Sequence, residues 1–399
     1  MEFSQLVGQE QTVHRLIEMV KQNRLGHALL FLGKEGSGAL PLALSFAQYL
    51  VSFSPDAPLV EDLFGGMSAL EPTGGFKSPA EIYTTSAYQR AAQLQHPDLH
   101  FSYPVIPKKS GDKPTSSDYA AEWRDFIKTY PYGNVYDWIQ SLNAENKQGN
   151  ITAEECKRIF HEMSLKAFES KYKILLMWMP EYLAKEGNKL LKILEEPPPN
   201  TVFLLVAESE EQILPTILSR CQIIRVPLPD DADIQKSLVE KAGADPATAQ
   251  RVAVMAEGNY REALQMLQHA EEDWQELLKE WLNASLKTGP QAQLKLIEEL
   301  ARLGREKQKQ FLRYFNHLLE TSIRLRVLGD KAPVVPAAEA DFAARLNKIS
   351  SVSQQEAIIK ELDKAAYYIE RNAHAKMLFL SLTIRLRHII QHKSLILED

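Results

Sequence analysis

The chain has 399 residues, of which 45% are hydrophobic and 25% charged, so it has the composition of a soluble globular protein with two or three domains. A formal net charge of −6 argues against a surface that is basic overall, although a local basic strip would fit it. Only Cys156 and Cys221 are present, which excludes a disulfide framework and a four-cysteine zinc site. No apolar run approaches the ~18 residues of a membrane span. The start, MEFSQLVGQE, is too polar for a signal peptide, so we expect a cytoplasmic protein without membrane contacts.

Residues 3–50 predict a helix, a strand, a glycine loop and a second helix, in that order. The first helix has an apolar face at helical spacing and is expected to end near Gly26 (Val13, Leu16, Ile17 and Val20). His27–Leu32 is a compact apolar strand. The loop GKEGSGAL follows directly, and the next helix tolerates Pro41 in its first turn.

This order of elements is the setting of a phosphate-binding loop. In the motif G-x-x-x-x-G-K-[ST], the lysine contacts the phosphates and the hydroxyl contacts Mg²⁺. The loop glycines are present here (Gly33, Gly36 and Gly38). Ala39 replaces the lysine, Leu40 replaces the hydroxyl residue, and Lys34 lies on the wrong side of the turn to substitute. The loop therefore predicts backbone groups that could hold an anion, but no metal.

Residues 51–150 predict an irregular insertion, rich at first in Pro, Gly, Ser and Thr. His96, Asp98 and His100 are three candidate metal ligands, but a strand edge is the better interpretation. A later stretch carries aromatic residues near several basic ones (Lys108, Lys109, Lys113 and Arg124). These aromatic residues either stack on single-stranded nucleic acid or pack against their own domain, and we favour packing.

Residues 151–226 continue the α/β pattern. A helix with a core face (Cys156, Ile159, Phe160 and Met163) leads into the strand Lys173–Leu176, and a short helix then ends at three prolines. Thr201–Ala207 and Ile223–Val226 are further strands. Arg220 lies between these two strands, at the end of a short helix, and this position predicts that its guanidinium is held in place. From the spacing alone, a structural salt bridge is the favoured interpretation of Arg220. Both cysteines are interpreted as packing residues.

The remainder of the chain predicts helices. Residues 230–275 form short helices interrupted at Gly243–Pro246, and Ala332–Pro336 connects two parts of an all-helical region that begins near residue 280. Two apolar stripes in this region are expected to be partly exposed in the free chain and covered in an assembly. Their members are Phe311, Phe315, Leu318 and Leu319, and Ala357, Ile358, Leu362, Ala365 and Tyr368.

Several of these segments resemble one family. LLKILEEPP, an apolar strand and LPTILSRCQ, in this order, resemble bacterial clamp-loader ATPases of the AAA+ class, as do the opening FSQLVGQE and RLGHALLFLG and the later EGNYREAL. The resemblance implies an α/β P-loop AAA+ core at 1–228 with the insertion at about 51–150, a helical lid at 229–278 and an all-α collar at 279–399.

The resemblance also assigns roles to residues. Arg220, within the Ser219-Arg220-Cys221 motif, corresponds to the arginine finger that enters the nucleotide site of a neighbouring subunit. Met177 and Trp178 occupy the two positions where active members carry carboxylates, and neither side chain can bind Mg²⁺ or accept a proton. Arg261 corresponds to the lid arginine that senses nucleotide, although pairing with Glu257 or Glu262 is the safer interpretation.

The chain is therefore expected to be a non-hydrolysing part of the DNA polymerase III clamp loader, without a cofactor or metal, and not an enzyme by itself. The implied partners are the gamma/tau ATPase subunits and the delta subunit, and through them the sliding clamp and primer-template DNA. Two alternatives stay open: an NTPase with a degenerate loop, and an adaptor built on an inactive AAA+ core outside replication.

Overall fold

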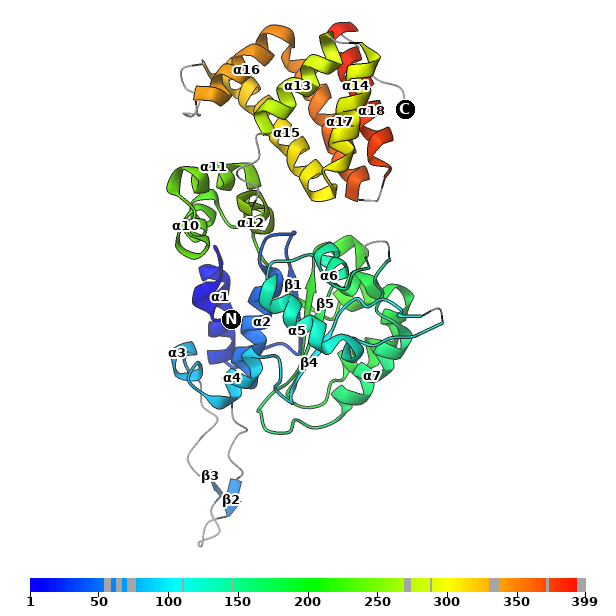
Figure 1. The fold of residues 1–399 in the computed structure, drawn as a ribbon. Coiled ribbons are helices and arrows are strands. Elements are labelled where there is room, and N and C mark those ends of the chain that lie inside the picture. Colours follow the sequence, from blue (N-terminus) through cyan, green and yellow to red (C-terminus); the bar gives the residue numbers. More distant parts are fainter. Residues whose placement is uncertain are drawn as a thin grey trace. The chain divides into compact units, whose positions relative to one another are not determined.

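The computed structural model describes residues 1–53, 59–61, 67–69, 77–109, 111–144, 147–268, 274–287, 289–329, 337–370 and 373–392. It divides the chain into two units, Met1–Leu267 and Gln268–Asp399, which we describe separately (Figure 1).

A five-stranded parallel sheet forms the centre of the first unit, in the order β4-β5-β6-β1-β7. Its strands are β1 (Ala28–Leu32), β4 (Leu99–Ser102), β5 (Lys173–Trp178), β6 (Thr201–Ala207) and β7 (Gln222–Arg225). β5 and β6 are buried along their whole length. For this reason their sequences are continuous apolar runs and do not alternate between apolar and polar residues. The predicted strand at 201–207 is confirmed, whereas β7 begins and ends one residue earlier than expected, and β5 continues two residues further.

Helices cover both faces of the sheet. Alternate residues of β1 belong to different apolar clusters, with Leu29 and Phe31 on one side and Ala28 and Leu30 on the other. α2 (Ala39–Val51) packs on the first side. α7 (Ala153–Ser164), the 3₁₀ segment η3 (Pro180–Leu190) and α8 (Leu191–Glu195) pack on the second. In α7 the predicted core face is correct except at Phe160, which is exposed.

Other elements complete this unit. η1 (Phe3–Gln5) and α1 (Glu10–Lys21) precede β1, and α1 ends earlier than the Gly26 limit that we expected. η4 (Glu210–Gln212) and α9 (Pro215–Leu218) lie between β6 and β7. The predicted short lid helices are α10 (Asp231–Ala242), α11 (Pro246–Ala256) and α12 (Tyr260–Gln268).

The insertion is more regular than predicted. Its described residues form the hairpin strands β2 (Leu59–Glu61) and β3 (Met67–Ala69), the central-sheet strand β4 and five helical segments. These segments are α3 (Pro79–Ile82), α4 (Ser86–Ala92), η2 (Ser116–Tyr119), α5 (Ala120–Thr129) and α6 (Val135–Ser141). The irregular interpretation is wrong for them because short helices with capping residues, such as Thr85 and Asn134, give only weak periodicity.

Among the residues that the structure describes, the second unit contains helices and no strands, as predicted. They are α13 (Trp274–Lys287), α14 (Pro290–Arg302), α15 (Arg305–Leu328), α16 (Ala337–Ile349), α17 (Val352–Glu370) and α18 (Ala375–His392). The proposed boundary at 278/279 falls inside α13, and Ala332–Pro336 lies outside the described residues. The fold class predicted from the sequence, an α/β core followed by a helical lid and an all-helical C-terminal part, is confirmed.

The expectation about exposed apolar stripes is wrong for most of their residues. Phe311 and Phe315 of α15 are fully buried and pack against Trp281, at ring-centroid distances of 5.5 and 6.1 Å. Phe379 of α18 packs on the same indole at 6.0 Å. The stripes therefore form the core of this unit, and in α17 only the aromatic end of the stripe, Tyr368, is exposed.

Candidate functional site: a closed phosphate-binding loop

The glycine loop connects β1 to α2 at the carboxyl edge of the parallel sheet, where such folds bind ligands. Two of its glycines adopt left-handed backbone conformations, Gly36 with φ +77° and Gly38 with φ +84°. Gly38 is the N-cap of α2, so Ala39 and Leu40 are the first helical residues, and both are buried. The structure thus places this loop between a strand and a helix, with the apolar side chains of Ala39 and Leu40 in the first turn of α2.

The two presumed carboxylate positions separate in space. Trp178, at the end of β5, lines the cavity beside the loop and packs on Trp123 at 5.2 Å. Met177 points to the opposite face of the sheet and belongs to the other apolar cluster. Of this pair, only Trp178 is brought to the loop.

The cavity beside the loop is too small for a nucleotide. Its volume is about 30 Å³, whereas ligand pockets typically measure ~300–1,000 Å³. Tyr132 contributes to the closure: its hydroxyl accepts a hydrogen bond from the Val7 N–H at 3.2 Å, and its ring packs on Tyr260 of the lid at 4.7 Å. A Cβ atom at Gly38 would lie 3.0 Å from the same ring.

An ion-pair network centred on the buried Arg261 side chain joins the loop to the lid. The Arg261 guanidinium donates two hydrogen bonds to Asp137, at 2.6 Å from Nε and 2.5 Å from Nη2, and a third from Nη1 to Glu35 Oε1 at 3.1 Å. Glu35 also accepts from Asn134 Nδ2 at 2.8 Å and from Asn259 Nδ2 at 3.3 Å. The Arg261 side chain is only 4% exposed.

The sequence interpretation of Arg261, which named Glu257 or Glu262 as its partner, did not anticipate this network. Both glutamates are close in sequence, but the observed partners, Glu35 and Asp137, lie on the loop and on α6. Sequence reasoning missed them because the pairs span 226 and 124 residues. The only available signal was a glutamate inside a loop that ought to attract anions.

The loop backbone is also engaged by other parts of the unit. Gly36 C=O accepts from the Tyr260 N–H at 3.3 Å, and Gln9 Nε2 donates to Ser37 C=O at 2.9 Å and to Pro227 C=O at 2.8 Å. Gln9 is 1% exposed, so these bonds are inside the protein. The lid and the linker that precedes it therefore lie directly against the loop.

Arg220 lies at the surface, between α9 and β7. Its Nε donates to Glu195 Oε1 at 2.8 Å, with Nη2 on the same oxygen, and Nη1 donates to Thr216 C=O at 2.6 Å and to Ser219 Oγ at 3.0 Å. The side chain is 30% exposed. The guanidinium is held in place by its ion pair with Glu195 at the surface, and not by burial between strands. Beside it Cys221 is half-buried, and burial raises its thiol pKa to about 11, which fits a packing role.

The candidate ligands of the insertion have structural partners. His96 is buried, and its Nδ1 accepts from the Asp98 N–H at 3.1 Å while Nε2 lies 3.2 Å from Glu169 Oε1. Asp98 accepts from three backbone N–H groups, those of Phe168, Glu169 and Ser170. The part of the chain that the structure describes contains no cluster of His, Cys, Asp and Glu suited to a metal ion.

Most aromatic residues of the insertion are buried, as we favoured. Trp123 and Trp138 pack edge to face at 5.4 Å, and Tyr103 stacks on Trp123 at 4.0 Å. Their rings are therefore not available to stack on bases. Cys156 is likewise a core thiol, and burial raises its pKa to about 11.

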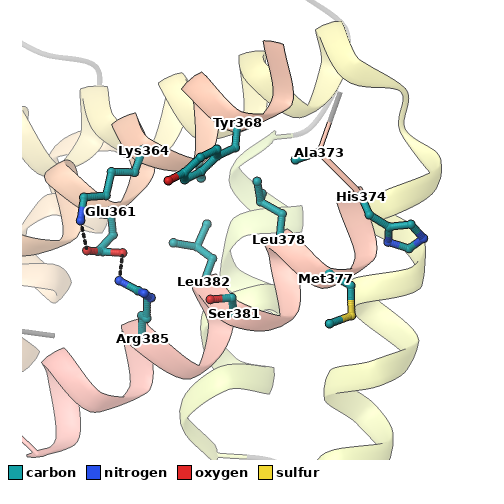
Figure 2. Close-up of a pocket in the computed structure, with 11 residues that line it drawn as sticks. Glu361, Lys364, Tyr368, Ala373, His374, Met377, Leu378, Ser381, Leu382 and Arg385 are labelled. Carbon is teal, nitrogen blue, oxygen red and sulfur yellow. Dashed lines mark hydrogen bonds and ion pairs between the residues drawn. The ribbon is translucent and has the colours of Figure 1, made fainter. Parts of the chain in front are cut away.

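The second unit has a groove between α17 and α18, with a volume of about 320 Å³ (Figure 2). Tyr368 of α17 and Met377 of α18 line it, and they are 52% and 63% exposed. At one end Glu361 pairs with Arg385 at 2.9 Å and with Lys364 at 3.7 Å. The groove is thus an exposed apolar surface with an ion-paired end. Separately, none of the described helices is long and apolar enough to cross a membrane.

Comparison with known proteins finds similarity to subunits of DNA polymerase III. Residues 77–230 match the family model described as "DNA polymerase III, delta subunit". The chain is 25% identical over 263 residues to "DNA polymerase III subunit delta'" of Bacillus subtilis, covering 66% of this chain and 60% of that protein. It is 32% identical to the delta' subunit of Haemophilus influenzae, over 40% of this chain and 46% of that one.

Other matches cover less of the chain or have a low structural similarity. The gamma subunit of Buchnera aphidicola is 31% identical over 29% of this chain and 34% of its own length. A gamma subunit-related protein from Thermotoga maritima aligns over 94% of this chain and 99% of its own, at 15% identity and a TM-score of 0.37, which is too low to carry an argument. The matched part thus spans about a third to three fifths of the first two curated relatives, and it confirms the resemblance found in the sequence.

Proposed function

Because the chain is a clamp-loader delta-prime-like protein, we propose that it serves in the cytoplasm as a non-hydrolysing subunit of the DNA polymerase III clamp loader. Its partners in this proposal are the gamma/tau ATPase subunits and the delta subunit. Through them it acts on the sliding clamp and on primer-template DNA. It belongs to a polymerase holoenzyme but catalyses no reaction alone.

The closed loop is the observation that carries the non-hydrolysing part of this proposal. Ala39 and Leu40 lack the ammonium and hydroxyl groups that phosphate and Mg²⁺ need, and Trp178 stands at the edge of the sheet where a carboxylate would act. A cavity of about 30 Å³ leaves no room for a nucleotide. The first unit then acts as a rigid core and lid whose conformation does not depend on a nucleotide.

Arg220 would supply the active chemistry, as a finger for the nucleotide site of a neighbouring ATPase subunit. Its surface position and partial exposure support this role. To reach a neighbour's phosphate, the guanidinium must exchange its bond with Glu195, and exposed pairs of this kind are worth only ~0–1 kcal/mol. A phosphate group between subunits easily offsets that loss.

The helical unit would join the partner subunits. Its stripes form its own core, whereas the groove between α17 and α18 offers an exposed apolar area for a partner (Figure 2). Tyr368 and Met377 are residue types that are enriched at protein interfaces.

Reconstitution tests the proposal. Purified chain, mixed with gamma/tau and delta subunits, should form a stable complex that loads clamps on primed DNA, while the complex without it should not. Titration of the isolated chain with ATP and Mg²⁺ should show no Mg²⁺-dependent binding. Such binding would support the degenerate NTPase instead, and a chain that forms no complex with these subunits would support an adaptor outside replication.

A further inference from the structure

The glutamate in the phosphate-binding loop has no place in the proposal above. We propose that Glu35 is a built-in anionic ligand, which replaces a bound phosphate and holds the lid against the loop through Arg261. This inference concerns the isolated chain and does not depend on the clamp-loader role.

The partners of Glu35 are those that an anion would require. A loop between a parallel strand and the start of a helix favours negative charge. These donors come from two separate segments, Asn134 from the start of α6 and Asn259 and Arg261 from the start of α12, and each donates a hydrogen bond to the Glu35 carboxylate. A planar guanidinium binds carboxylates and phosphates in the same way. Because the carboxylate is part of the loop, it binds without the entropic cost of capturing a free ion.

The charges of the network disfavour a second anion. Arg261 carries one positive charge, and it faces the carboxylates of both Glu35 and Asp137. A phosphate that approached this site would meet two negative groups and one positive group. With Glu35 removed, the Asn134 and Asn259 amides and Arg261 Nη1 lose the hydrogen bonds that they donate to it.

The fit of the loop against the lid is tight at the next residue. A Cβ atom at Gly36 would lie 2.0 Å from Asn259 Oδ1 and 2.7 Å from Asn259 Cα. The backbone bond from Tyr260 N–H to Gly36 C=O lies beside this contact. Exchange of the Tyr260 amide therefore reports directly on whether the loop and the lid are together.

Hydrogen exchange of the full chain tests the inference. In Glu35→Ala, amides of residues 259–264 should exchange about tenfold faster, as expected for the loss of hydrogen bonds to a charged group. Glu35→Gln, which keeps the shape of the side chain, should give an intermediate effect and remains informative if the alanine variant folds poorly. Glu122→Ala, at an exposed glutamate on α5, is the matched control and should leave these amides unchanged.

Rescue by inorganic phosphate separates a ligand from a merely structural residue. Millimolar phosphate, compared with chloride at equal ionic strength, should restore protection of residues 259–264 in Glu35→Ala and have no effect on the wild type. Unchanged exchange in both Glu35 variants would overturn the inference. Faster exchange that phosphate does not reverse would also overturn it, because Glu35 would then act by packing alone.

Discussion

Replacing Arg261 by methionine should destabilise the first unit strongly. The guanidinium is 4% exposed, and its charge-assisted hydrogen bonds include two to Asp137 and one to Glu35. Removing one partner of a buried ion pair costs ~3–5 kcal/mol, because the remaining charges are left uncompensated. The side chains of Asp137 and Glu35 are 12% and 28% exposed, so water partly hydrates them and we expect the lower end, ~3 kcal/mol. In a unit of this size, that corresponds to a fall in Tm of ~6–12 °C.

Differential scanning calorimetry of the full chain would measure this change in the transition of the first unit. Glu257→Gln is the control, since the structure gives this exposed residue no part in the network, and its effect should stay within ~0.5 kcal/mol. Asp137→Asn, added to Arg261→Met, should recover part of the stability by removing an unpaired charge. A loss below ~1 kcal/mol for Arg261→Met would refute the assignment of the network as the link between loop and lid.

Three further predictions address other features. Ala39→Lys alone should give no ATP hydrolysis in the purified chain, because Leu40 and Trp178 still lack metal and base functions; turnover above a contaminant control would contradict this. Tyr368→Glu combined with Met377→Glu should weaken assembly with the partner subunits in size-exclusion chromatography without unfolding the chain, whereas unchanged assembly would exclude the groove. Burial lowers the pKa of His96 below its usual value of 6.5. Because the unfolded state then binds a proton more readily than the folded state, the free energy of unfolding should fall as the pH drops below about 6.5. His96→Gln should flatten that dependence in urea titrations, and an unchanged slope would assign it to other groups.

The sequence predicted the fold where hydrophobic patterns were long. The structure has the predicted strand at 201–207, and it has the predicted succession of a strand, a glycine loop and a helix within residues 28–51. These strands were predictable because buried parallel strands have continuous apolar runs in the sequence. The insertion could not be predicted equally well. Its helices are short, and β4 is a four-residue edge strand whose identity depends on pairing with β5.

The sequence predicted the residues of the loop, but it did not predict which residues pair with Arg261. The loss of lysine and hydroxyl at Ala39 and Leu40 is visible in the sequence. The partners of Arg261 are not, because Glu35 and Asp137 approach it only after the lid packs on the loop. Apolar periodicity likewise cannot tell a stripe that faces its own unit from one that faces a partner, which is why Phe311 and Phe315 were misassigned.

Clamp loading by a reconstituted complex that carries Arg220→Ala tests the central claim most directly. An arginine finger can be worth ~10³–10⁵ in rate at the site it serves. The complex should still assemble and lose only part of its DNA- and clamp-stimulated ATPase, while clamp loading should fall further because the sites act together. Arg220→Lys should not rescue loading, since a point charge lacks the planar fork. Arg225→Ala, at an exposed arginine nearby on β7, should behave as wild type. Loading at the wild-type rate by Arg220→Ala would show that this arginine serves only its surface pair with Glu195.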